Sequence, residues 1–185
     1  VAWVNAYYNA FTRRQDKLAD YATNPNIALV CGFMCAETDE EALRRADGWT
    51  FFQFALRFYA SQGPIEPGTV NLWNEYQSWK DSESGLKART TALVGSPETL
   101  RRKLRKFEVS NIDQVILLNQ AGKNTHEDIC SSLDLFAREV MPEFHGREAQ
   151  HQEWKRAVLS GDILLDEIDT GLYRDTVRPV RVENA

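Results

Sequence analysis

The sequence predicts an α/β fold whose parallel sheet is left incomplete by this chain alone. Two apolar runs, 27–36 and 113–120, have the near-continuous hydrophobicity of parallel strands that are covered on both faces. Segments with helical periodicity alternate with these runs along the chain. Two parallel strands by themselves would leave an apolar face and unpaired edges exposed. We therefore expect the other strands of the sheet to lie outside this sequence.

Composition and charge exclude several classes of protein. The 185 residues are 43% hydrophobic and 26% charged, with nine Phe, six Tyr and five Trp, which predicts one folded domain rather than disorder. The net charge of −5 argues against a nucleic-acid partner. No apolar stretch approaches the ~18 residues of a membrane-spanning helix, and no secretory leader is visible. With three Cys in no disulfide pattern, we expect a cytoplasmic protein without a membrane partner.

The first half of the chain is predicted to contain one helix before the first strand and one after it. Aromatic residues at helical spacing predict a helix over 1–22, which Asn24-Pro25 ends. After the first strand, Thr38 and Glu41 form a capping box, and the helix that follows runs toward Tyr59 with aromatic residues on more than one face. Such a helix is expected to be strongly buried.

Residues 61–90 change character. Gly, Pro and Ser interrupt regular structure there, and Trp73, Tyr76 and Trp79 lie between the interruptions. We expect a long connection, because long connections in compact domains are usually functional or disordered.

The second half of the chain contains a further strand between helices. Ser96-Pro97-Glu98 marks a helix start, and that helix ends before Asn111. After the second strand, Thr125 caps a helix that runs to Val140. The tail is expected to hold one short helix around 154–159.

Three segments carry a family resemblance through their order and spacing. Residues 94–100 (VGSPETL), 111–117 (NIDQVIL) and 133–144 (LDLFAREVMPEF) resemble the C-terminal signature of bacterial-luciferase-like flavin-dependent monooxygenases. Residues 36–42 (AETDEEA) are similar to the segment after that family's seventh strand. The resemblance covers roughly residues 1–144, so we divide the chain into 1–144 and a tail, 145–185.

The resemblance implies part of a (β/α)8 TIM barrel, a fold of about 250 residues. It makes residues 27–36 similar to strand seven, 113–120 similar to strand eight, and 61–90 similar to the mobile active-site loop between them. Strands one to six are absent from the sequence, so the resemblance implies a partner, the N-terminal half of the barrel, as another chain or segment. It also implies a dimer.

The implied reaction uses reduced FMN and O2 to oxygenate a small organic substrate. By resemblance, a separate flavin reductase or NAD(P)H would supply the reduced flavin. A deazaflavin-dependent oxidoreductase of the same fold is one alternative. A non-catalytic flavin-binding or structural subunit that completes a barrel is another, and a free-standing helical interaction module is a third, which the two strands disfavour.

Candidate site residues follow from the barrel rule that chemistry lies at the C-terminal ends of strands. Asn119 and Gln120 would bind the flavin ring or the substrate, unless they only satisfy turn backbone groups. Ser96, at a helix N-terminus, would bind a phosphate, unless it is a plain cap. Trp73, Trp79 and Lys80 on the 61–90 segment would exclude water and bind an anionic group, unless they serve packing and solvation.

His126 would donate a hydrogen bond to the substrate or a peroxide, unless it is a surface residue of a capping turn. The three cysteines are interpreted as packing residues, and we expect no metal site. The sequence contains no Walker loop, dinucleotide fingerprint or Ser-His-Asp spacing. Catalytic residues are left unassigned, because most would lie in the absent half.

Overall fold

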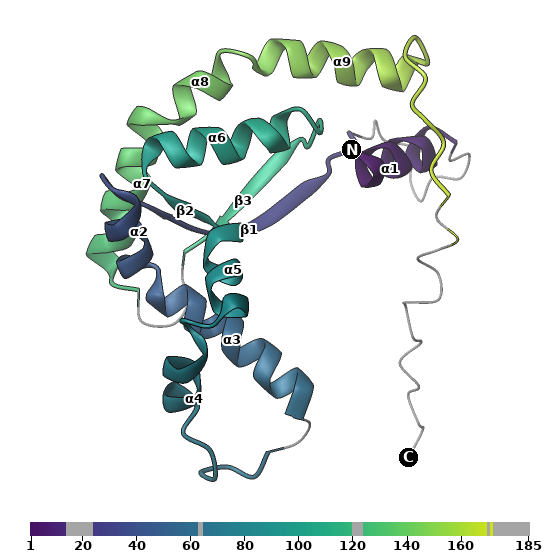
Figure 1. Cartoon of the computed structure of the whole chain (residues 1–185). Helices are drawn as coiled ribbons and strands as arrows, with labels where there is room; N and C mark the ends of the chain where they lie inside the picture. Colours follow the sequence, from purple (N-terminus) through teal and green to yellow (C-terminus); the bar gives the residue numbers. More distant parts are fainter. Residues whose placement is uncertain (14–23, 63–64, 120–123, 170, 172–185) are drawn as a thin grey trace. The chain divides into compact units, whose positions relative to one another are not determined.

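In the computed structural model, which describes residues 1–13, 24–62, 65–119, 124–169 and 171, the chain forms two compact units (Figure 1). One unit comprises Ala28–Glu148, and the other comprises Val1–Ile27 together with Ala149–Ala185. The predicted division into 1–144 and a tail, 145–185, follows the family resemblance and stays a prediction. The N-terminal helix belongs with the tail and not with the sheet, because its buried aromatic ring packs on a tail helix.

The larger unit contains a parallel sheet of three strands within its described residues, in the order β2-β1-β3. Strands β1 (Ala28–Cys35) and β3 (Gln114–Leu118) confirm the two predicted strands and the α/β class. Strand β2 (Leu93–Gly95) was not predicted as a strand. Its three residues are too short to give a periodicity signal.

The strand order agrees with a barrel in one respect and departs from it in another. Strands β1 and β3 pair from Ala28↔Gln114 to Gly32↔Leu118, as the neighbouring strands seven and eight of a barrel would. Strand β2, however, pairs with Phe33–Cys35 on the other edge of β1. That edge would belong to the preceding strand in a barrel. The structure thus shows a parallel α/β sheet, and the barrel stays a prediction.

The described part of the larger unit contains seven helices besides this sheet. They are α2 (Asp39–Arg45), α3 (Asp47–Gln62), α4 (Leu72–Trp79), α5 (Glu83–Thr91), α6 (Pro97–Glu108), α7 (His126–Glu139) and α8 (Met141–His145). The predicted caps Thr38, Ser96 and Thr125 each accept a hydrogen bond from the N–H three residues on. The single helix predicted from Thr38 toward Tyr59 is two helices, because α2 ends at Ala46.

The predicted connection 61–90 is largely helical, which corrects the sequence-based expectation. Helices α4 and α5 occupy most of it. Asn71 and Ser82 are their N-caps and accept hydrogen bonds from the Asn74 and Gly85 N–H groups. Turn residues and cap residues have the same composition, so the pattern alone did not separate them.

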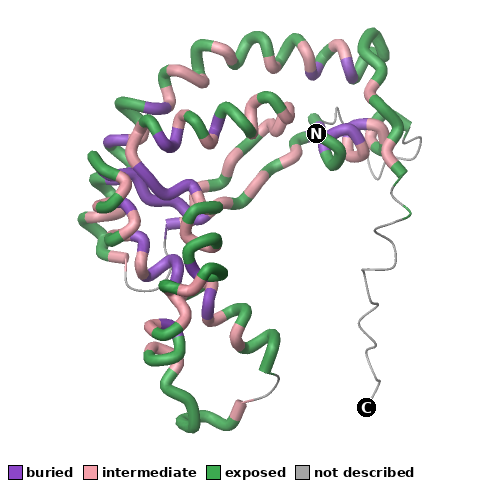
Figure 2. The backbone as a smooth tube through the Cα atoms, in the orientation of Figure 1, coloured by how far each residue is buried: buried purple, intermediate pink, exposed green. Residues whose placement is uncertain are grey.

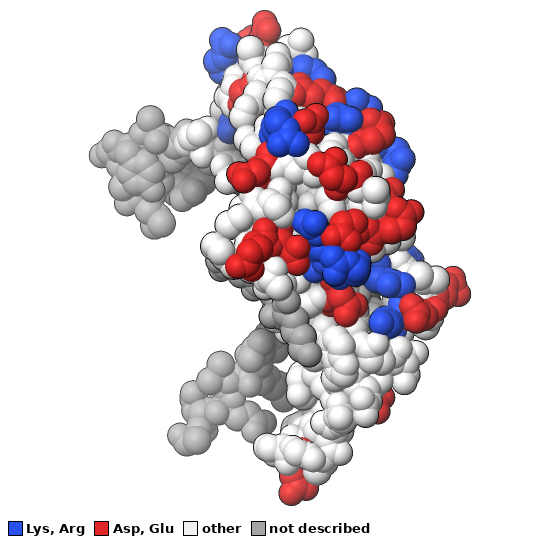
Figure 3. Space-filling model, turned by 90° about the vertical axis from the view of Figure 1, so that its left-hand side faces the viewer, with Lys and Arg blue, Asp and Glu red and all other residues white. Residues whose placement is uncertain are grey.

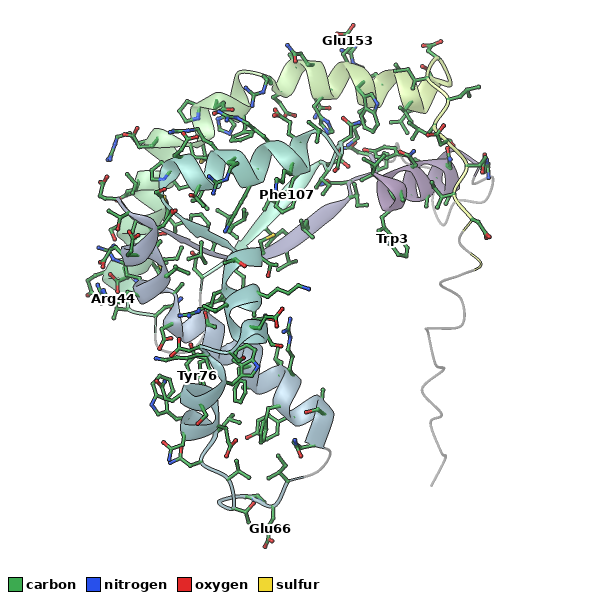
Figure 4. All side chains as sticks on the ribbon, in the orientation of Figure 1. Trp3, Arg44, Glu66, Tyr76, Phe107 and Glu153 are labelled. Atoms are coloured by element: carbon green, nitrogen blue, oxygen red, sulfur yellow. The ribbon has the colours of Figure 1, made fainter. Side chains whose placement is uncertain are left out.

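One face of the sheet is covered by helices α6 and α7. Phe33 of β1 stacks edge-on against Phe136 of α7, with ring centroids 5.0 Å apart. Phe107 of α6 packs against the same core, in which the buried residues are Phe33, Cys35, Leu93, Leu100, Leu104, Leu135 and Val140 (Figure 4). This face is the main hydrophobic core of the unit.

The other face of the sheet is covered only toward the C-terminal ends of the strands. Met34 packs there against Ala42 and Ala46, and the Trp49 ring lies directly on Gly32. Val30 and Ile116, which pair across β1 and β3, are 57% and 42% exposed. Figure 2 shows this change from buried to exposed along the strands. The sheet is therefore half-covered on this face.

The smaller unit is built on helix α1 (Ala2–Thr12) and on helix α9 (Glu148–Ser160), whose first residue belongs to the larger unit. Tyr8 is fully buried and meets Trp154 edge-on at 5.3 Å. Helix α9 confirms the helix predicted around 154–159 and is longer. Helix α1 confirms the start of the predicted 1–22 helix, and residues 14–23 lie outside the described residues.

Candidate functional site

The three parallel strands end at one edge of the sheet, and polar residues follow them there. Strand β1 ends at Cys35 and is followed by Glu37, while Ser96 follows β2 and Asn119 follows β3. The C-terminal edge of a parallel sheet is where α/β proteins place their ligands. We therefore describe this edge as the candidate site.

Asn119 and Asn124 present two buried acceptors at the end of β3. The Asn119 amide nitrogen donates to the Leu117 carbonyl at 3.3 Å, and the Asn124 amide nitrogen donates to the Asn119 carbonyl at 2.9 Å. The Oδ1 atoms of both side chains are buried, and no donor among the described residues reaches them. A buried acceptor without a partner is costly, so these atoms suit a ligand N–H. Gln120, predicted beside Asn119, lies outside the described residues.

Ser96 is held by Asp39 at the N-terminus of α6. The Ser96 N–H donates to Asp39 Oδ1 at 2.6 Å, and the Thr99 hydroxyl donates to Oδ2 at 2.9 Å. These hydrogen bonds lower the pKa of Asp39, and the bond from the Ser96 backbone N–H has the largest effect. The Ser96 hydroxyl accepts from the Thr99 N–H. Since a carboxylate already occupies this helix start, the phosphate-binding role of Ser96 stays a prediction, and the cap role is confirmed.

A hollow of about 300 Å³ adjoins the end of β1, between α2 and α7. Two guanidinium groups, of Arg45 and Arg138, and two carboxylates, of Glu37 and Asp134, line it. Arg45 is already paired, since its Nε lies 2.6 Å from Glu41 Oε1 and 3.2 Å from Asp128 Oδ1. The balanced charges suit a neutral or zwitterionic group better than a phosphate.

Cys35, at the inner wall of this hollow, is not a nucleophile in this setting. Its backbone N–H donates to the Ser132 hydroxyl oxygen at 2.6 Å. Burial raises the pKa of the Cys35 thiol most, and the charge of Glu37 raises it further. The charge of Arg101 lowers this pKa, and the resulting value is about 12. A thiol rather than a thiolate is present near neutral pH, which agrees with the packing role predicted for it.

The predicted loop residues Trp73 and Trp79 belong to an aromatic cluster between α3 and α4. Trp73 meets Phe51 at 5.2 Å, and Trp79 meets Phe54 at 5.1 Å. Tyr76 lies at the centre of the cluster and donates its hydroxyl to Asp47 (Figure 4). Lys80 ends α4 through its backbone N–H. Both Trp residues therefore pack against Phe residues of α3, and not beside Asn119.

His126 is the first residue of α7 and is exposed. Its Nε2 lies 3.5 Å from the Cys130 sulfur, one helical turn on. Within the described residues no group of three or more His, Cys, Asp and Glu is placed to hold a metal ion. None of the described helices is long and apolar enough to cross a membrane.

Several residues of this edge were not singled out from the sequence. Glu37 could have been found, because it directly follows an apolar strand. Asp39 and Ser132 could not, because their partners Ser96 and Cys35 are 57 and 97 residues away and no local spacing signals them. Arg138 lies in the resemblance segment 133–144, which gave it no role.

Comparisons with known proteins assign neither a family nor an activity. No family model matches the chain, and no curated protein matches it. Among solved structures, the chain is similar to the monooxygenase RslO1 from Streptomyces bottropensis, with 19% sequence identity and a TM-score of 0.41. The likeness covers 67% of this chain and 32% of that one. The chain thus spans about a third of the length of the solved structure it matches.

Proposed function

We propose that this chain supplies the C-terminal part of an α/β barrel in a flavin-dependent monooxygenase. In the proposed reaction, reduced FMN and O2 oxygenate a small organic substrate, and a reductase or NAD(P)H supplies the reduced flavin. The observation that carries the proposal is the half-covered sheet. Helices α6 and α7 cover one face, while Val30 and Ile116 are exposed at paired positions on the other.

A barrel accounts for the exposed part of this face, whereas Ala42, Ala46 and Trp49 cover the part toward the C-terminal ends of the strands. Parallel sheets are normally buried on both faces, and a barrel covers the outer face with helices and the inner face with its other strands. Strand β2 pairs only with the last three residues of β1, which leaves the edge beside Ala28–Gly32 for a further strand. The missing strands would come from the N-terminal half of the barrel, as another chain or segment.

The residues present fit FMN at one point of the candidate site. The buried Oδ1 atoms of Asn119 and Asn124 are acceptors suited to the ring N–H of a flavin. Bound reduced FMN would supply the electrons that activate O2. This chain's own contribution would be to orient the ring through these two amides.

The test is native mass spectrometry of the chain as purified from cells, followed by an absorbance scan of the small molecules released on denaturation. The proposal expects a mass above 21.2 kDa and a released flavin. A 21.2 kDa monomer that melts cooperatively and releases no flavin would overturn it. A deazaflavin spectrum would favour the alternative oxidoreductase, and a flavin complex without O2 uptake would favour a non-catalytic subunit.

Two variants make this test specific. Val30→Lys charges the open sheet face and is expected to abolish the higher mass. Asn119→Leu removes a buried acceptor and is expected to weaken FMN binding at least tenfold in a fluorescence titration of the complex. Asn111→Gly is the matched control, because Asn111 precedes β3 at its opposite end and has a φ of 56°, which Gly adopts without strain.

A further inference from the structure

The hollow between α2 and α7 combines opposite charges with an apolar floor. Its volume is about 300 Å³, and Cys35, Ala36 and Leu135, all buried, form the floor. The charged residues at its rim are Glu37, Arg45, Asp134 and Arg138. Figure 3 shows charged side chains of both signs gathered on the side that carries α2 and α7. A concave site with an apolar lining and a few converging polar groups is typical of ligand-binding sites.

Two carboxylates of the rim have no partner within the described part of the chain. Glu37 stands two residues after β1, and Asp134 lies on α7. Neither forms a hydrogen bond or a close ion pair with another described residue. The hydrogen bond to Glu139 raises the pKa of Arg138 most, and the charges of Glu37 and Asp134 raise it further. The two carboxylates therefore lie near one guanidinium group and can still accept hydrogen bonds from a bound cation.

The two guanidinium groups of the rim differ in how far they are already bonded. Arg45 is paired with two carboxylates, and its Nη1 also donates to the Ser131 hydroxyl at 3.0 Å. Among the described residues, Arg138 donates only to Glu139, from Nε at 2.8 Å, and its side chain is 64% exposed. Its two terminal nitrogens are left, and such a pair matches the two oxygens of a carboxylate. Arg138 is therefore the anion-binding group of the hollow.

We propose that this hollow binds a free α-amino acid with a small apolar side chain. The ammonium group of the ligand lies between Glu37 and Asp134, which share its three N–H donors. The carboxylate of the ligand accepts hydrogen bonds from the two terminal nitrogens of Arg138. The side chain of the ligand packs on the apolar floor beside Cys35 and Leu135. Each charged group of the ligand thus meets a group of opposite charge.

The spacing along α7 suits a ligand whose two charged groups are close together. Asp134 and Arg138 are four residues apart, so they are neighbours on one face of the helix, with Cβ atoms about 5–6 Å apart. The ammonium and the carboxylate of an α-amino acid are attached to a single carbon atom, so they need binding groups that are neighbours. In a peptide the two charged ends are farther apart. A free amino acid therefore fits this pair better than a peptide does.

Other charged ligands would meet a repulsive group in the hollow. A phosphate would face the carboxylates of Glu37 and Asp134, and a divalent cation would face the guanidinium groups of Arg45 and Arg138. The four rim charges sum to zero, as do the charges of a zwitterion. The volume lies at the lower end of the range of ligand pockets, about 300–1,000 Å³, which suits a molecule as small as valine.

Calorimetric titration of the full chain with L-valine tests the binding. The charged rim is exposed and its ion pairs are therefore weak, so we expect a Kd of about 1 mM. N-acetyl-L-valine lacks the ammonium group and L-valinamide lacks the carboxylate, so each should bind about tenfold more weakly or worse. An analogue that binds as tightly as valine would refute the contact that it lacks. The absence of saturable valine binding up to about 20 mM would overturn the proposal.

NMR spectroscopy of the isotope-labelled chain locates the binding site. Valine should shift the amide signals of residues 35–37 and 131–138 in a saturable way, because these residues form the hollow. Shifts confined to other parts of the chain would show that valine binds elsewhere and would overturn the assignment. The binding needs neither a flavin nor further strands, so it does not rest on the proposed function. A chain that releases no flavin is still expected to bind valine.

Charge-removing variants test the individual contacts. Arg138→Gln and Glu37→Gln each remove one charge of the rim and should weaken valine binding about tenfold. Arg44→Gln and Glu40→Gln are the matched controls, because both residues are exposed on α2 and do not line the hollow. Both controls should bind valine as the parent chain does, and all four variants should unfold in urea at the midpoint of the parent. An equal loss of binding in a variant and its control would contradict the proposed contact.

Discussion

Replacing Asp39 with Ala is expected to destabilise the candidate site specifically. The carboxylate joins the start of α2 to the start of α6 through its bonds from the Ser96 N–H and the Thr99 hydroxyl, at 2.6 and 2.9 Å. Hydrogen bonds to charged groups contribute about 1.5–3 kcal/mol each, and the partial exposure of Asp39 favours the lower end. We expect Asp39→Ala to lower the free energy of unfolding by about 2–3 kcal/mol.

The assay is urea unfolding at neutral and acidic pH. Because the two bonds lower the pKa of Asp39, the unfolded chain binds the proton more tightly than the folded chain. The stability that Asp39 provides is therefore present above its ordinary pKa of about 3.9 and is lost as the pH falls through the folded value. The difference between the parent chain and Asp39→Ala should be full at pH 7 and should shrink below about pH 4.

Glu40→Ala is the matched control, because Glu40 is an exposed carboxylate in the same helical turn. A loss with Asp39→Ala no larger than with Glu40→Ala would refute the reasoning. A double-mutant cycle with Thr99→Val isolates one of the two bonds, and we expect a coupling of about 1 kcal/mol. Zero coupling would mean that the Thr99 hydroxyl contributes nothing to the link.

Three further predictions concern buried contacts of the sheet, each checked by urea unfolding. Gly32→Ala would place a Cβ 1.8 Å from Trp49 Cε2, so it should cost about 1–3 kcal/mol, and less when Trp49→Leu is added. Ser132→Ala removes the acceptor of the Cys35 N–H, so it should cost about 1–3 kcal/mol and speed hydrogen exchange at that amide. Lys103→Met removes the ammonium that donates to the Ala92 and Val94 carbonyls and should cost a similar amount. Because burial lowers the pKa of Lys103, the parent's stability should rise with pH up to the ordinary value of about 10.4, and the variant should lose this rise.

The parts of the fold that could be predicted are those that local sequence determines. A cap bond spans three residues, so Thr38, Ser96 and Thr125 could be recognised without knowing the fold. The continuous apolar runs predicted β1 and β3 because burial on both faces leaves no place for polar residues. Strand β2 was not predicted, because three residues are too few to show a hydrophobic periodicity. Its strand conformation depends on pairing with β1.

Some features of the candidate site could likewise be predicted from local sequence, and others could not. Asn119 could be predicted, because it follows a strand and strand ends share one edge of a parallel sheet. The hollow beside Cys35 could not, because it arises where α2 and α7 meet β1, and those elements are far apart in sequence. The aromatic residues of 61–90 were recognised as a group, but their partners on α3 were not, since the connection between two helical faces is a tertiary property.

The open sheet face also limits what can cover it. Full burial of a Val or Ile side chain contributes about 1.5–3 kcal/mol, and about half of that remains to be gained at Val30 and Ile116. The gain at these two side chains is therefore about 1 kcal/mol each. A partner that brings strands would gain more, because it would also satisfy the backbone groups along the edge beside Ala28–Gly32, for which the described residues supply no strand. The exposed pair lies on the face of the sheet and the free edge lies in its plane, so a partner would need one strand to pair with the edge and further elements to cover the face.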